Sequence, residues 1–138
     1  MSRRGPNKSE TLGKIILDIA KIPSEFKADN SGPALMLNGN GYWNDYICHD
    51  DILVELNGAA HSRRKVRIRD ARLCADLIEN NALYLEQKRI YGTSREKFYY
   101  LLFFDVSAVY DDPQRNFVDK IERIHLTRPK QFIFDWST

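Results

Sequence analysis

"LIENNALYLEQKRIYGTSREKFYYLLFF", residues 77–104, carries the strongest structural signals of the chain. Its first positions continue a helical spacing of apolar residues, and "ALYLEQKRI" (82–90) then alternates as a strand does. Gly92 sits in a polar turn, and "KFYYLLFFDV" (97–106) is an almost unbroken apolar run that is typical of a strand buried on both faces. The stretch therefore predicts a helix that runs into a long β-hairpin.

The residues before this stretch predict the helix itself, over 67–80. Apolar side chains that share one helical face are expected to point toward the core, with Leu73 and Leu77 widening that face. These side chains are Ile68, Ala71, Cys74, Ala75 and Ile78. The Asn80-Asn81 pair tolerates the left-handed backbone of a helix end and predicts the end of this helix.

The N-terminal half contains weaker signals. Residues 1–8 lack apolar periodicity and are expected to form a flexible basic arm, and residues 9–22 predict a helix that stops before Pro23. Residues 28–46 are rich in Gly, Asn and Pro, which predicts a loop with at most one short strand. A short helix is expected over 50–56, closed by Asn57 and Gly58.

The C-terminal part predicts one helix and one strand. Asp112 is expected to cap a helix with Pro113 at its first position, and Phe117, Val118, Ile121 and Ile124 follow at helical spacing. "PKQFIFDW" (129–136) alternates like a terminal strand. Residues 9–138 are therefore expected to form a single domain.

Composition agrees with one soluble domain. The 138 residues include seven Tyr, seven Phe and two Trp, which can fill a core without a disulfide or a cofactor. Cys48 and Cys74 lie among apolar neighbours in no metal-binding spacing, so they are expected to be reduced thiols. The net charge is +2 and no apolar run is long enough to cross a membrane, so the expected location is the cytoplasm, with no membrane contact.

The predicted order of elements over residues 9–106 resembles that of winged-helix DNA-binding domains. The resemblance rests on residues 77–104, where an apolar helix end is followed by a strand, a basic tip and an aromatic strand. It implies an α+β fold of winged-helix-like helices with a β-hairpin wing, to which this chain adds the C-terminal helix and strand. It also implies that residues 67–80 are the recognition helix and residues 89–97 the wing.

Clustered cations then indicate a partner. Neutralising phosphates releases condensed counterions, so two basic clusters favour regulatory, non-catalytic binding of duplex DNA. The candidate DNA-binding residues are Arg63, Arg64, Lys65, Arg67, Arg69, Arg72, Lys88, Arg89, Arg95 and Lys97. Interleaved carboxylates could instead pair with these cations, and the same face could bind an acidic protein as an inhibitor or adaptor would. A homodimer through the C-terminal helix and strand is the further expected interaction.

A catalytic alternative remains open. In "LEQK" (85–88), Glu86 and Lys88 show the E-x-K arrangement that resembles metal-dependent nucleases of the PD-(D/E)xK type, and Asp70 would be the partner carboxylate. In that family the two carboxylates hold Mg²⁺, while the lysine stabilises the scissile phosphate or orients water. The main hypothesis assigns no catalytic residue, metal or cofactor, because phosphate-binding loops and paired zinc ligands are missing from the sequence.

Overall fold

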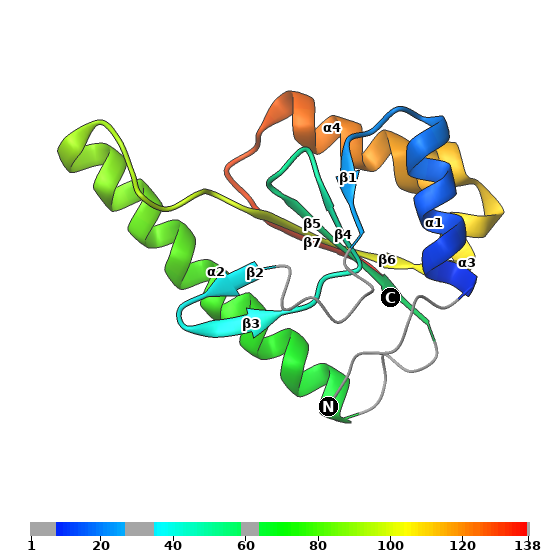
Figure 1. Ribbon diagram of the computed structural model, residues 1–138, viewed down its shortest axis with the longest axis horizontal. Helices are drawn as coiled ribbons and strands as arrows, with labels where there is room; N and C mark the ends of the chain where they lie inside the picture. The colour runs from blue at the N-terminus through cyan, green and yellow to red at the C-terminus, as the bar shows by residue number, and fades with distance from the viewer. Residues whose placement is uncertain (1–7, 27–34, 59–63, 138) are drawn as a thin grey trace.

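The computed structural model describes residues 8–26, 35–58 and 64–137, and it shows a mixed β-sheet between two layers of other elements (Figure 1). The sheet has five strands in the order β1-β4-β5-β6-β7, and a separate two-stranded hairpin joins β2 and β3. Strand β4 is antiparallel to both of its neighbours, whereas β5, β6 and β7 run parallel to one another. Parallel neighbours require crossover connections. Helix α2 makes the first of these and the α3 to α4 segment makes the second.

The elements have the following bounds. The strands are β1 (Ser24–Glu25), β2 (Leu35–Leu37), β3 (Asn40–Tyr42), β4 (Tyr46–Cys48), β5 (Ile52–Asn57), β6 (Tyr100–Asp105) and β7 (Ile133–Trp136). The helices are α1 (Lys8–Ile19), α2 (Arg64–Tyr91), α3 (Val106–Asp111) and α4 (Asp119–Thr127), and a π-helical turn, η2 (Gln114–Val118), precedes α4.

Strand β6 separates two apolar cores because successive side chains point to opposite faces. Leu102 and Phe104 pack with Leu17 of α1 and with Phe117 and Ile121 of the C-terminal helical segment. On the other face, Leu101 and Phe103 belong to a second core with residues of α2 and of the β2-β3 hairpin. The expected strand over 97–106 is thus confirmed, and it is buried on both faces as predicted.

Helix α2 is a single helix of 28 residues, about 42 Å long at 1.5 Å per residue. Leu73 and Leu77 are fully buried against the sheet, but Ile68 and Ile78 are more than half exposed. The predicted core face is therefore right only in part: Leu73, Leu77 and Cys74 pack into the second core, whereas Ile68, Ala71, Ala75 and Ile78 face solvent. Both stripes repeat at helical spacing, and only the position of the sheet selects the buried one.

Three further expectations about secondary structure are wrong. Residues 28–46, expected to hold at most one short strand, contain both β2 and β3. Residues 82–90 continue α2 instead of forming a strand, so the β-hairpin wing, on which the winged-helix resemblance rested, is not formed. Residues 50–56, expected as a short helix, form most of β5, where Ile52, Leu53 and Val54 are completely buried. A central strand is apolar on both faces, so its sequence lacks the alternation that identifies half-exposed strands.

Other expectations hold. The first helix and the terminal strand form close to their predicted positions, and the fold mixes helices with a sheet. Asp112 accepts a hydrogen bond from the backbone N–H of Arg115 at 3.1 Å, as expected of a cap. Cys48 and Cys74 are free thiols that contribute to different cores. Within the described ranges, none of the helices combines the length and the apolarity that a membrane crossing requires.

Candidate functional site

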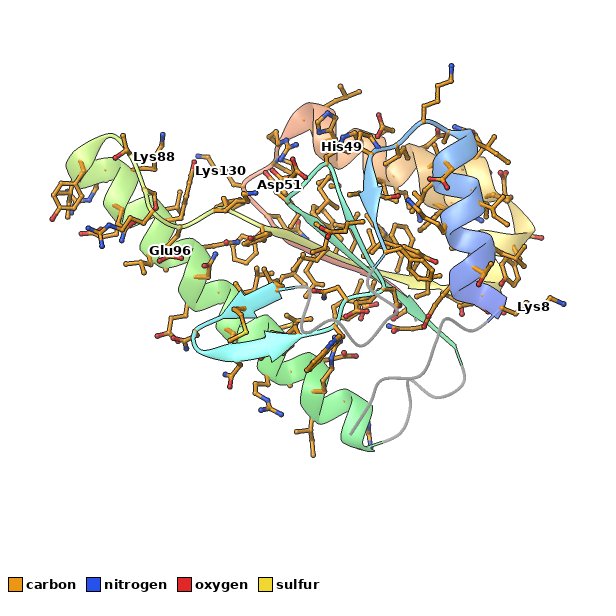
Figure 2. The ribbon with its side chains drawn as sticks, in the orientation of Figure 1. Lys8, His49, Asp51, Lys88, Glu96 and Lys130 are labelled. Carbon is orange, nitrogen blue, oxygen red and sulfur yellow. The ribbon has the colours of Figure 1, made fainter. Side chains whose placement is uncertain are left out.

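A cleft of about 750 Å³ opens between the C-terminal half of α2, the segment that returns from α2 to β6, and the segment that follows α4. Figure 2 shows Lys130, Glu96 and Asp51 around this region, at some distance from the α1 end marked by Lys8. The volume lies in the range of small-molecule sites in proteins. The lining residues are Asp51, Tyr84, Leu85, Arg95, Glu96, Lys97, Phe98, Tyr100, Arg128, Pro129 and Lys130.

The return segment, residues 93–99, is fixed to α2 by side-chain amides. Asn81, which is completely buried, donates to the carbonyl of Tyr99 at 2.9 Å and accepts from its N–H at 3.1 Å. Asn80 donates to the carbonyl of Lys97 at 2.8 Å, and Gln87 accepts from the N–H of Arg95 at 3.0 Å. A buried backbone outside a sheet needs such partners. These amides therefore hold Arg95 and Lys97 at the rim of the cleft.

Arg128 forms part of the opposite wall and is held from several sides. It ends α4 with a left-handed backbone, φ 45°, and its Nε donates to the carbonyl of His125 at 2.8 Å. Its guanidinium lies 5.7 Å from the centroid of the Tyr100 ring and donates to Asp51 Oδ2. The other carboxylate oxygen, Asp51 Oδ1, is buried and has no hydrogen-bond partner among the described residues.

Three aromatic side chains line the cleft. Phe98 lies at their centre, with ring centroids 5.6 Å from Tyr84 and 5.3 Å from Tyr100, both in edge-to-face contact. Tyr100 also donates its hydroxyl to the carbonyl of Pro129 at 2.8 Å, which fixes the wall that carries Lys130. The cleft thus combines an aromatic lining with four cations and two carboxylates.

The structure divides the predicted DNA-binding residues into three groups. Arg95 and Lys97 line the cleft, and Lys88 and Arg89 lie close by in the chain, in the last turn of α2. Arg67 and Arg72 are exposed in the N-terminal half of α2, 16 or more residues from Lys88 and so about 24 Å or more along the axis. Arg63 lies outside the described residues, and Arg64 and Lys65 belong to the first turn of α2.

Arg69, another predicted DNA-binding residue, is not available to a partner. Its Nη1 lies 2.6 Å from Glu55 Oε1 on β5 and 3.1 Å from Asp70 Oδ1. Burial alone would lower the pKa of Arg69, but the two carboxylates raise it, so the side chain stays charged. Sequence reasoning placed this arginine on a DNA-facing surface, whereas it joins α2 to the sheet.

The ion pair between Arg69 and Glu55 belongs to a buried cluster of side-chain oxygen atoms beside β5. Glu55 is 5% exposed and accepts from Asn44 Nδ2 at 3.1 Å, while Asp45 Oδ2 accepts from the N–H of Leu56 at 2.7 Å. Asn44 is completely buried, and its Oδ1 has no hydrogen-bond partner in the part of the chain that is described. Two carboxylates and an amide oxygen therefore lie together, with the guanidinium of Arg69 beside them.

The nuclease alternative is wrong at the residues expected to form it. Glu86 and Lys88 lie on α2, where positions two apart point in widely different directions, and Glu86 pairs with Arg89 at 2.7 Å. Asp70 lies 16 residues earlier on the same helix. Across residues 8–26, 35–58 and 64–137, no group of three or more His, Cys, Asp or Glu side chains is arranged to hold a metal ion.

Sequence reasoning missed Arg128 and Lys130 of the cleft and Asp45 with Glu55 of the cluster. No short spacing relates Arg128 and Lys130 to the predicted residues, because a crossover brings their elements together. Asp45 and Glu55 meet through the antiparallel β4-β5 pair, whose second strand was expected to be a helix. Comparison with known proteins finds no match for this chain among family models, curated proteins or solved structures.

Proposed function

We propose that this chain binds nucleic acid through its backbone phosphates, without chemistry, as the sequence suggested for duplex DNA. The observation that carries the proposal is the cleft, where two segments far apart in the sequence bring Arg95 and Lys97 together with Arg128 and Lys130. Arg128 is engaged with Asp51. No ion pair joins Arg95, Lys97 or Lys130 to a carboxylate among the described residues, so these three cations are the candidates for phosphate contacts.

The backbone segments that carry these cations are held in place, and this strengthens the proposal. A surface cation on a mobile loop loses side-chain and backbone freedom when it binds, which reduces its contribution. Here Asn80, Asn81 and Gln87 hold the backbone of the return segment, and Tyr100 holds the Pro129 carbonyl next to Lys130. The cations are therefore positioned before a ligand arrives. Arg67 and Arg72 would extend the binding surface along the outer face of α2 on a long ligand.

The test is the salt dependence of binding, measured by fluorescence anisotropy of a labelled duplex at several salt concentrations. Replacing Arg95, Lys97 and Lys130 by Ala should weaken binding and flatten the log-log salt slope by about one unit for each phosphate that is no longer neutralised. The matched control replaces Lys8, Lys21 and Arg115, which are exposed cations of the α1 and C-terminal helical layer. It changes net charge equally and should leave the slope nearly unchanged. Equal effects of the two triple variants would contradict a specific phosphate surface.

A protein partner with an acidic surface stays the alternative for the same cations. This alternative predicts that the protein shows no salt-dependent binding to nucleic acid. It also predicts that the acidic partner binds the wild-type protein and the control variant but not the variant at Arg95, Lys97 and Lys130.

A second candidate function is favoured by the cluster beside β5. Glu55 and Asn57 stand two apart on a strand, with Asp45 next to them, so the Glu-x-Lys pattern sought at residues 86–88 occurs here with Asn in place of Lys. Asp45, Glu55 and Asn44 Oδ1 are oxygen ligands of the kind that Mg²⁺ prefers, and Mg²⁺ often completes its shell with substrate phosphate and water. A bound Mg²⁺ would polarise a phosphate and acidify water.

The protein's own residues would then have one role in phosphodiester cleavage: Asp45 and Glu55 would hold the cation. Mg²⁺-dependent cleavage of DNA that is abolished in Glu55→Gln and retained in Glu86→Gln would establish this function. Absence of cleavage with Mg²⁺ or Mn²⁺ in the wild-type protein would exclude it and leave the cluster with a structural role.

A further inference from the structure

We infer that the cleft between α2 and the segment after α4 receives one unpaired nucleotide. This inference rests on the proposed function and specifies it: phosphates bind at the rim, and an unstacked base enters the cleft. It predicts a preference for single-stranded ends over continuous duplex.

The shape and lining of the cleft carry the first step. Its volume of about 750 Å³ accommodates a mononucleotide, whereas a duplex is too wide to enter. Tyr84 and Phe98, which are both partly exposed, supply aromatic surface on one side. Every base has a π-face, so contact between a base and an aromatic side chain is favourable for all sequences. A purely phosphate-binding surface would not require these apolar walls.

The position of the cations carries the second step. Arg95 and Lys97 come from the return segment and Lys130 from the segment after α4, so two walls of the cleft carry cations. A nucleotide presents its phosphate at one end and its apolar base faces at the other. A ligand with this distribution of charge matches the cleft, whereas a purely apolar ligand would leave the cations without partners.

The experiment titrates the whole protein with mononucleotides, following backbone amide chemical shifts and the heat of binding. Deoxyadenosine 5′-monophosphate should bind and shift the amides of residues 95–100. Deoxyribose 5-phosphate, which lacks the base, should bind at least about tenfold more weakly, because it makes no contact with the aromatic side chains. Equal affinities for the two ligands would overturn the role of the aromatic wall, and failure of the nucleotide to bind would overturn the site.

A variant pair tests the aromatic wall independently. Tyr84→Ala should lower nucleotide affinity, whereas Tyr110→Ala, at an exposed tyrosine of α3 outside the cleft, should not. If Tyr84→Ala fails to fold, the comparison of ligands with the wild-type protein still decides the question.

Duplexes separate the two proposals. Stronger binding of a duplex with a single-stranded overhang than of a blunt duplex supports the inference. Salt-dependent binding of both duplexes with equal affinity supports the proposed function and overturns the inference. Binding of mononucleotides without any binding of DNA supports the site and overturns the proposed function.

Discussion

Arg69 Nη1 lies 2.6 Å from Glu55 Oε1, and this ion pair joins helix α2 to the central strand β5. Glu55 is almost completely buried in the pair, whereas Arg69 is partly exposed. The side chain of Glu55 is 7% exposed and that of Arg69 is 32% exposed. Removing one partner of such a pair leaves a buried charge without compensation, which costs more than the pair itself contributes. This asymmetry yields a test of how α2 is attached to the sheet.

We expect Arg69→Ala to lower the free energy of unfolding by about 3 kcal/mol, the low end of the range for broken buried pairs, because Arg69 is partly exposed. The double variant Arg69→Met with Glu55→Gln removes both charges and should be destabilised clearly less. Urea denaturation of the three proteins measures both values. A double variant that is less stable than Arg69→Ala would contradict the explanation from the uncompensated charge.

Helix α2 has one buried and one exposed apolar stripe. A truncation in the exposed stripe can be compared with a truncation in the core around β6. Leu102→Ala removes a completely buried side chain of β6 and should cost about 2 to 5 kcal/mol. Ile78→Ala truncates a side chain that is 52% exposed, at a helical position that suits Ala. It should change the free energy of unfolding by no more than about 0.5 kcal/mol. Thermal or urea unfolding checks both. A large destabilisation by Ile78→Ala would mean that its face of α2 is covered in solution.

Gly13 is required by a close approach between α1 and β4. A Cβ at this position would collide with the hydroxyl of Tyr46, which donates to the Glu10 carbonyl, and would come within 3.2 Å of Leu56 Cδ1. We expect Gly13→Ala to cost about 1 to 3 kcal/mol through overpacking, even though Ala favours helix. Gly58→Ala is the control, because no atom of the described residues lies within 4 Å of a Cβ there. A stabilised Gly13→Ala protein would show that the helix can shift.

His125 makes stability depend on pH. Burial lowers its pKa, the nearby His49 and Arg128 lower it further, and Glu122 and Asp51 oppose the change. The two imidazoles stack with ring centroids 3.6 Å apart. Because the unfolded chain then binds the proton more readily, the contribution of His125 to stability is present above its unfolded pKa of about 6.5 and is lost as the pH falls below that value.

The corresponding measurement is the unfolding free energy between pH 5 and pH 8 for the wild-type protein and for His125→Gln. The wild-type value should fall more steeply below about pH 6.5, since only the wild type has a group at position 125 that gains a proton on unfolding. Parallel curves for the two proteins would contradict the lowered pKa.

Several elements could be predicted from the sequence because their signals are local. The apolar spacing before Pro23, the cap at Asp112 and the aromatic run over 97–106 specified a helix, a turn and a strand wherever the rest of the chain lay. A strand apolar on both faces requires cover on both sides, so the mixture of helices with a sheet also followed from the sequence.

The conformation of residues 77–104 depends instead on distant parts of the chain. Asn80 and Asn81, which locally favour a helix end, are helical because their amides bond the backbone of residues 97–99. The same bonds place Arg95 and Lys97 opposite Lys130, more than 30 positions away. The cleft arises from crossovers between parallel strands, and no local spacing can show which distant side chains a crossover brings together. In the β5 cluster, the antiparallel pairing of β4 with β5 brings Asp45 to Glu55, and α2 adds Arg69.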